Sequence, residues 1–170
     1  WARERPSRVD LATAADMEAI TAAYRRSYRQ LSVHTLLPQT MGQFQAVTEL
    51  LQRQQPLKLR QRLIATAGET AMLAGTLRFM DLYDFELGRS HLELAMAAAQ
   101  EAEARELGAF VLGCMGFHAR YSGNRKEAVD LIDQARHVAA RVASPLTQGW
   151  LAAVASEIHA VAGDAVASLG

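Results

Sequence analysis

A helix-reversal signal recurs every 40 residues along this chain, and it limits the possible folds more than any other feature. Shifting the sequence by 40 residues aligns Asp84 with Asn124 and Asp164, which are residue types that cap the first turn of a helix. Gly123 and Gly163 precede two of these caps, and glycine is the usual residue where a helix ends in a left-handed conformation. Because a repeated pair of helices buries its apolar face only against its neighbours, the recurrence predicts stacked antiparallel hairpins.

The agreement between the repeated segments continues into the helices that follow each cap. Asn124 is followed by Glu127 at the spacing of a capping box. Tyr83 takes the place of the turn glycine in the first unit. The aligned helix positions are small or apolar in both units: Gly88 with Ala128, Leu92 with Ile132, and Ala95 with Ala135.

Apolar residues at helical spacing predict a first helix over residues 13–30. Thr13 and Asp16 are placed to cap its start. A helix of this kind in front of a repeat array buries its apolar stripe in one of two ways: it caps the array, or it supplies a dimer contact. We expect the dimer contact, and therefore a homodimer. Its apolar positions are Met17, Ile20, Tyr24, Tyr28 and Leu31.

The next segment is predicted to be a loop over residues 32–39, followed by a second helix. Thr40 is placed to cap that helix, and Pro56 ends it because proline cannot continue the hydrogen-bond ladder. Two further helices are predicted over residues 57–80 and 84–106, with a break near Gly108.

The composition agrees with an all-α fold of one domain. The 170 residues include 32 alanines, and only 6% are aromatic, which suits closely spaced helices. The single cysteine, Cys114, excludes an internal disulfide framework, and no apolar run approaches the roughly 20 residues that span a bilayer. We therefore expect a soluble, cytoplasmic protein with no membrane partner.

Charge is balanced over the chain but not along it. The formal net charge is zero, so the chain lacks the basic excess of an autonomous nucleic-acid binder. Through Arg62 there are 10 basic and 5 acidic residues, and from Leu63 onward 8 and 13. A basic front is either an interaction surface or an ordinary solvated face. Residues 1–12 have the charged composition of a linker, so we expect this chain to be a piece of a longer protein.

No catalytic or metal-binding motif is present in the sequence. There is no HExxH, no glycine-rich phosphate loop and no GxSxG. Cys114 and His118 are four residues apart on one predicted helix, which suits two ligands, but no third or fourth ligand is near them in the sequence. We expect no enzyme activity, no metal and no cofactor. The histidines are scattered, at His34, His91, His118, His137 and His159.

One repeat carries the spacing of a known signature. Its residues are Leu112, Met115, Gly116, Gly123, Ala128, Ile132 and Ala135, and the pattern resembles that of tetratricopeptide repeats. The resemblance implies hairpins stacked as a right-handed solenoid of about seven or eight helices, with residues 57–170 as repeats and 13–56 as an N-terminal helical cap. The chain departs from the signature in its 40-residue period, in the lack of a closing proline, and in Ala74-Gly75, which comes one residue early. Generic helical hairpins remain the alternative.

A narrower resemblance covers the whole chain and implies a function. The segments that carry it are Ser7-Arg8-Val9-Asp10, Tyr24-Arg25-Arg26-Ser27-Tyr28-Arg29, Leu36-Leu37-Pro38, Leu73-Ala74-Gly75 and Asp84-Phe85. Their order resembles the C-terminal sensor region of actinobacterial helix-turn-helix transcriptional regulators with tetratricopeptide-like repeats. The resemblance implies a ligand- or peptide-sensing and oligomerisation domain that reaches DNA only through a domain absent from this chain. A protein-protein interaction scaffold with no small-molecule ligand is the alternative.

The tetratricopeptide resemblance also implies which side chains line the concave groove. A small hydrophobic ligand or a peptide would bind there, with its anionic group on Arg120. The alternative is that the aromatic residues only pack between repeats. The implied groove residues are Glu69, Met72, Thr76, Phe79, Phe110, Phe117, Arg120, Tyr121, Trp150 and Glu157.

Overall fold

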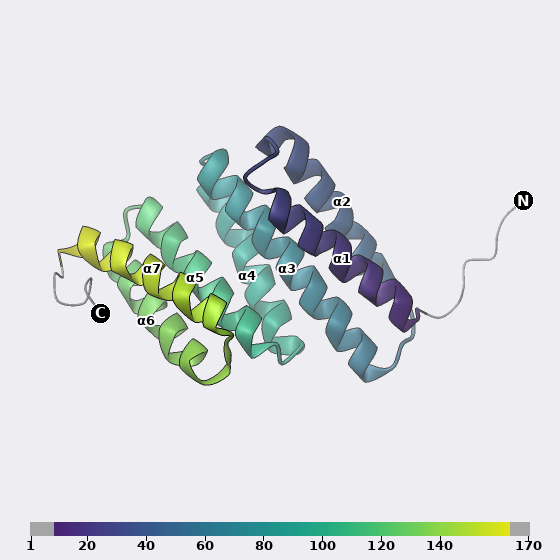
Figure 1. Ribbon diagram of the computed structural model, residues 1–170. Helices are drawn as coiled ribbons and strands as arrows, with labels where there is room; N and C mark the ends of the chain where they lie inside the picture. Colours follow the sequence, from purple (N-terminus) through teal and green to yellow (C-terminus); the bar gives the residue numbers. More distant parts are fainter. Residues whose placement is uncertain (1–8, 164–170) are drawn as a thin grey trace, which may run out of the picture.

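The computed structural model describes residues 9–163 and confirms the all-α class. This part of the chain forms seven helices and contains no strand (Figure 1). The helices are α1 (Leu11–Ser27), α2 (Val33–Leu51), α3 (Leu57–Asp81), α4 (Phe85–Glu101), α5 (Arg105–Tyr121), α6 (Arg125–Val142) and α7 (Pro145–Ala162). None of the described helices is long and apolar enough to cross a membrane.

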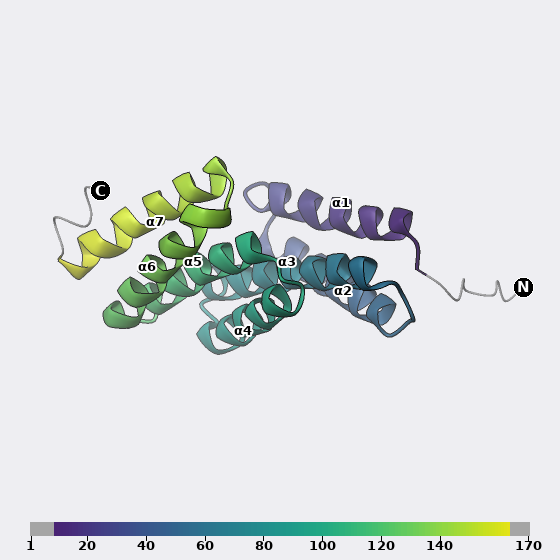
Figure 2. The same ribbon diagram turned by 90° about the horizontal axis from the view of Figure 1, so that it is seen from below.

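The helices stack as antiparallel hairpins. Helices α1, α3, α5 and α7 contact one another in succession, and α2, α4 and α6 each pack against the helices before and after them in the chain. Figure 2 shows α1 and α7 on one side of the α3 and α5 layer, with α4 on the opposite side. The right-handed twist of the solenoid stays a prediction.

The predicted turns are confirmed. The carboxylate of Asp84 accepts from the Leu87 N–H at 3.1 Å, and the side chain of Asn124 accepts from the Glu127 N–H at 3.2 Å. The Asn124 side-chain amide also donates to the Glu127 carboxylate at 2.8 Å, whereas the Asn124 backbone N–H donates to the Ala119 carbonyl at 2.8 Å, so the reciprocal bond of a capping box is not formed. Gly123 and Gly163 have φ of 84° and 85°, so both helices before them end in the left-handed conformation. Asp164 lies outside the described residues.

The break between α4 and α5 was predicted in the wrong place. Helix α4 ends at Glu101, and the turn runs through Glu103, whose φ is 54°. Gly108 lies inside α5. The two nearest residues with positive φ, at 83 and 123, stand 20 positions before and after Glu103, so every turn from α3 to α6 reverses the chain in the same way.

The prediction for the second helix was wrong at both ends. Residues 33–39 belong to α2, which begins at Val33 and ends at Leu51, well before Pro56. Pro38 lies inside the helix, and the burial of Leu36 against α3 offsets the backbone hydrogen bond that proline removes. Thr40 is not a cap, because its hydroxyl donates to the Leu36 carbonyl within the same helix.

Helix α1 is also capped by a residue other than those predicted. The carboxylate of Asp10 accepts from the Thr13 N–H at 2.7 Å, so the helix begins at Leu11, before Thr13 and Asp16. It ends at Ser27, three residues earlier than predicted. A buried hydrogen-bond chain then fixes it to its neighbours. The Gln43 amide of α2 donates to the Met17 carbonyl at 2.9 Å, and the hydroxyls of Thr21 and Thr70 lie 3.1 Å apart.

Small residues let the paired helices approach closely. A Cβ added at Gly75 would lie 2.9 Å from the Gly88 carbonyl oxygen of α4, and one at Gly116 would lie 3.4 Å from the Ala128 carbonyl oxygen of α6. Gly75 and Gly116 therefore serve the same contact although they are 41 residues apart, which accounts for the one-residue departure from the period. At Gly75 even a Cβ would push the helices apart, whereas at Gly116 a Cβ would make ordinary contact and only a longer side chain would separate them.

Candidate functional site

A hollow of about 370 Å³ lies where the first helices of the hairpins meet. Arg25 of α1 and Thr147 of α7 are among the residues that line it. Figure 2 shows these two helices on the same side of the α3 and α5 layer. Met72 and Phe110, two of the predicted groove residues, line this hollow together with Glu69. The other lining residues are Arg25, Ala65, Ala104, Arg105, Glu106, Leu107 and Thr147.

An ion pair crosses this hollow from α1 to α3. The Arg25 guanidinium lies 2.9 Å from the Glu69 carboxylate, and the two side chains are 43% and 35% exposed. The guanidinium also lies 5.8 Å from the centroid of the Phe110 ring of α5. The sequence shows Arg25 only as one of the basic residues in the front part of the chain, because nothing in its local pattern shows which distant helix it meets.

Three of the aromatic residues predicted for the groove form the contact between α5 and α7. The rings of Phe110 and Trp150 stack with centroids 4.0 Å apart at 9°, and Phe117 meets Trp150 edge-on at 6.4 Å. Gly113 makes room for the indole, since a Cβ there would lie 2.7 Å from its ring. The structure thus brings these predicted residues together as a packing seam, and Phe110 alone among the three also lines the hollow.

Arg120 and Glu157 pair with each other at the far end of the same seam. Their charged groups lie 2.8 Å apart, and the Arg120 side chain is only 18% exposed. The guanidinium also lies 4.7 Å from the centroid of the Tyr121 ring. Its Nε and Nη1 are buried and have no hydrogen-bond partner among residues 9–163. The cation that was expected to meet a ligand is therefore already held by a carboxylate of the next hairpin.

The three predicted residues that follow Glu69 on α3 serve mainly the core. Met72 and Phe79 are buried, and the Thr76 hydroxyl donates to the Met72 carbonyl. Phe79 packs edge-on against the His118 ring with the centroids 5.3 Å apart, and the Tyr121 centroid lies 6.4 Å away. Of these α3 residues, only Met72 reaches the hollow.

Glu106 joins the starts of α5 and α7 at the edge of the hollow. One of its carboxylate oxygens accepts from the Ser144 N–H at 3.0 Å, from the Ser144 hydroxyl at 2.7 Å and from the Thr147 hydroxyl at 2.8 Å. These three hydrogen bonds lower the pKa of Glu106, and the one from the Ser144 hydroxyl has the largest effect. Sequence reasoning missed this residue, because its donors lie 38 and 41 positions away.

Cys114 and His118 do not form a ligand pair. Burial raises the pKa of the Cys114 thiol to about 12, so the thiolate that binds metals is disfavoured. The His118 Nε2–H donates to the Phe85 carbonyl at 2.8 Å, which fixes the ring against the start of α4. Among residues 9–163, no three His, Cys, Asp or Glu side chains lie close enough together to hold a metal ion.

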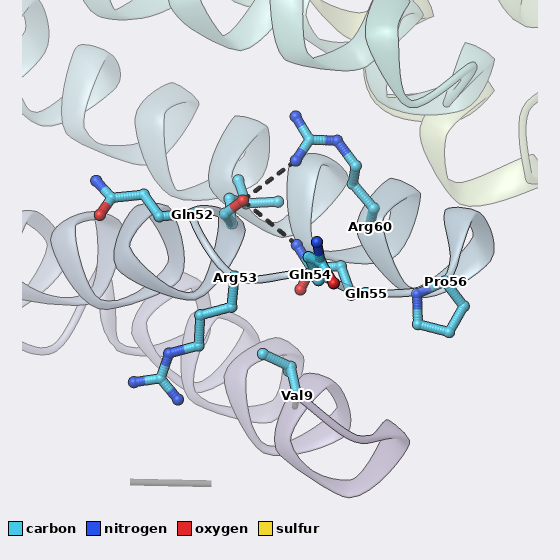
Figure 3. Close-up of a pocket in the computed structure, with 8 residues that line it drawn as sticks. Val9, Gln52, Arg53, Gln54, Gln55, Pro56 and Arg60 are labelled. Carbon is cyan, nitrogen blue, oxygen red and sulfur yellow. Dashed lines mark hydrogen bonds between the residues drawn. The ribbon is translucent and has the colours of Figure 1, made fainter. Parts of the chain in front are cut away.

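A second hollow of about 790 Å³ lies at the turn between α2 and α3 (Figure 3). Glutamine and arginine residues form most of its lining, and the remaining lining residues are Val9, Leu51 and Pro56. The Arg60 guanidinium donates to the Leu51 carbonyl at 3.2 Å and pairs with the Glu101 carboxylate at 3.3 Å. Arg60 thus binds groups of both α2 and α4 and stabilises the turn. We assign no ligand to this hollow.

Comparison of the chain with protein-family models, with curated proteins and with solved structures finds no significant match in any of the three. The resemblance to tetratricopeptide repeats therefore stays a prediction from the signature residues.

Proposed function

We propose that this chain is a non-enzymatic ligand- or peptide-sensing and oligomerisation domain of a transcriptional regulator, and that the hollow between α1, α3, α5 and α7 is its ligand site. One observation carries the proposal. At this place a half-exposed ion pair, Arg25 with Glu69, lies beside the ring of Phe110 and the side chain of Met72. Such a site binds an amphipathic molecule, because it offers both apolar surface and a charged group within reach.

The ligand class follows from the exposure of the two arginines. Arg25 is 43% exposed at the hollow, whereas Arg120 is 18% exposed and paired within the seam. The anion-binding role first given to Arg120 therefore passes to Arg25. A ligand with an apolar body and a carboxylate or similar acceptor would place the body on Phe110 and compete with Glu69 for the guanidinium.

The same contacts supply a route from binding to a change of shape. Arg25 belongs to α1, while Glu69 and Phe110 belong to the neighbouring helices α3 and α5. A ligand that draws Arg25 away from Glu69 favours an arrangement in which α1 sits differently on the stack. The ligand shifts the equilibrium only by its difference in affinity for the two arrangements. A DNA-binding domain attached ahead of α1 would be moved by that change.

A thermal-shift screen tests this function. Small-molecule and protein fractions of a cell extract are added separately, and a small-molecule or short-peptide fraction is expected to raise the melting temperature. Arg25→Ala removes the guanidinium and should abolish the shift, whereas Arg26→Ala changes the adjacent exposed arginine and should preserve it. A response to protein fractions alone would instead favour the interaction scaffold. A shift that Arg25→Ala leaves intact would place the ligand elsewhere.

A further inference from the structure

Two ion pairs join α1 to α3, and they differ in the number of contacts. Arg62 of α3 binds Glu18 of α1 with two nitrogens, each 2.8 Å from a carboxylate oxygen. Arg25 of α1 meets Glu69 of α3 through a single contact of 2.9 Å. The four side chains have similar exposed fractions, between 35% and 43%. The pair at the hollow is therefore the weaker one, because a bidentate pair makes two charge-assisted hydrogen bonds.

The single contact leaves hydrogen-bonding capacity unused at the hollow. Among residues 9–163, one guanidinium nitrogen of Arg25 donates to one oxygen of Glu69, and neither side chain makes another hydrogen bond. A guanidinium has five N–H donors, and a carboxylate has two acceptor oxygens. Since both residues line the hollow, a ligand there reaches a donor of Arg25 and an acceptor of Glu69 together.

The formal charges that line the hollow cancel. Arg25 and Arg105 are cations, and Glu69 and Glu106 are anions. Glu106 is held by hydroxyl and backbone donors, and no cation pairs with it in the described part of the chain. A ligand with only a negative charge meets two carboxylates as well as two guanidinium groups, so the net attraction is small. A ligand with one charge of each sign is complementary to this lining.

The exchange of partners at Arg25 also favours a ligand with both charges. A ligand carboxylate that competes with Glu69 for the guanidinium leaves the Glu69 carboxylate without a cation, which costs free energy at a partly buried site. A ligand ammonium removes this cost by pairing with Glu69. In a free α-amino acid the ammonium and the carboxylate are attached to the same carbon atom, so they reach both members of one ion pair.

The remaining lining sets the size and polarity of the ligand. The volume of about 370 Å³ is near the lower end of the roughly 300–1,000 Å³ that small-molecule sites span, so the hollow suits one small molecule. A peptide is less suitable, because its terminal ammonium and carboxylate belong to different residues. The apolar lining residues are Ala65, Met72, Leu107 and Phe110.

We infer that the hollow selects a free apolar α-amino acid of about the size of leucine, with its carboxylate on Arg25 and its ammonium on Glu69. Its side chain packs on Met72, Leu107 and Phe110. This inference rests on the proposed function, since it names the ligand class of the same site. Glu69 is then the specificity-determining residue, because its carboxylate distinguishes an amino acid from a simple carboxylic acid.

Isothermal titration calorimetry of the whole chain tests the ligand class, with L-leucine as the probe. Isocaproate lacks the ammonium, isoamylamine lacks the carboxylate, and N-acetyl-leucine represents the end of a peptide. The wild-type chain should bind L-leucine at least about tenfold more tightly than each of these analogues, since each lacks a charged hydrogen-bonding group. Glycine, which lacks the apolar side chain, should give no measurable heat of binding.

Two matched variants test the role of Glu69. In Glu69→Gln the preference should disappear, so that L-leucine and isocaproate bind within about twofold of each other. Glu18→Gln breaks the other ion pair between α1 and α3, at similar exposure, and should keep the tenfold preference. Arg25→Ala should abolish the binding of both compounds.

The outcomes separate this inference from the proposed function. Isocaproate or N-acetyl-leucine binding as tightly as L-leucine overturns the inference, and the ligand site still stands if Arg25→Ala removes that binding. A Glu69→Gln variant that keeps the preference for L-leucine also overturns it. If none of the probes binds, the amino-acid class is wrong, and the extract screen decides the proposed function on its own. Binding of L-leucine that survives Arg25→Ala contradicts the proposed site itself.

Discussion

The indole of Trp150 lies flat on the ring of Phe110, with the centroids 4.0 Å apart, and fastens α7 to α5. The indole reaches this position only because residue 113 is glycine, where an added Cβ would lie 2.5 Å from the Leu151 side chain and 2.7 Å from the indole. The chain therefore closes its last hairpin contact through an aromatic pair, and Phe110 of this pair also lines the hollow that we propose as the ligand site.

Gly113→Ala is expected to destabilise the protein by about 1–3 kcal/mol, because the new methyl group forces Trp150 and Leu151 to move. Chemical denaturation measures the loss. Gly149→Ala on α7 is the matched control, since a Cβ there meets nothing within 4 Å. The control should be neutral or stabilising by up to about 1 kcal/mol, through helix propensity alone. Equal effects of the two substitutions would contradict the packing of α7 on α5.

Tyr83→Gly is expected to raise the unfolding free energy of the monomer by about 1 kcal/mol, because it relieves the left-handed conformation at φ 57°. Glu103→Gly relieves a similar conformation, at φ 54°, in the turn before α5, and should stabilise the protein by a similar amount. Chemical denaturation of the two variants measures the gain. A Tyr83→Gly variant that is no more stable than the wild type would contradict a strained backbone at this turn.

Glu106 is expected to make stability depend on pH. Its pKa is lowered in the folded protein by hydrogen bonds from Ser144 and Thr147. Its contribution is therefore full above the pKa of an unfolded glutamate and is lost as the pH falls through the lower folded value. Glu106→Gln should lower the melting temperature at pH 7 and reduce its fall between pH 5 and pH 3. Glu103→Gln, in the preceding turn, is the control. An unchanged pH profile for Glu106→Gln would show that the hydrogen bonds of Glu106 to Ser144 and Thr147 contribute nothing to stability.

Arg120→Ala is expected to lower stability by about 1 kcal/mol, because it breaks the pair with Glu157 and removes the guanidinium that lies over the Tyr121 ring. It should leave the ligand-induced thermal shift in place, in contrast to Arg25→Ala. Loss of the shift with unchanged stability would restore Arg120 as the ligand anchor.

Features set by neighbouring residues could be predicted from the sequence, and the turns illustrate why. Asp84 and Asn124 cap the residues three positions later, and Gly123 needs only its own φ, so each signal lies within a few residues of its effect. The predicted loop over residues 32–39 was wrong because the burial of Leu36 against the distant helix α3 favours a helix there, although Pro38 lies inside it.

The candidate site could be predicted only in part. The seam residues Phe110 and Trp150 were found because the repeat signature fixes their register on successive hairpins. Arg25 and Glu106 were missed as site residues, since their partners lie 44, 38 and 41 positions away, and no periodicity relates them. The pairing of Arg120 with Glu157 likewise shows that a shared groove position does not reveal whether a charge is free or already neutralised.

Backbone amide chemical shifts test the central claim most directly. The fraction that raises the melting temperature is added to ¹⁵N-labelled protein, and the perturbed amides are mapped on the fold. The account predicts that the largest changes fall around Arg25, Glu69 and Phe110, and that Arg25→Ala removes them. Changes confined to the α2–α3 turn around Arg53 and Arg60, or changes that persist in Arg25→Ala, would contradict it.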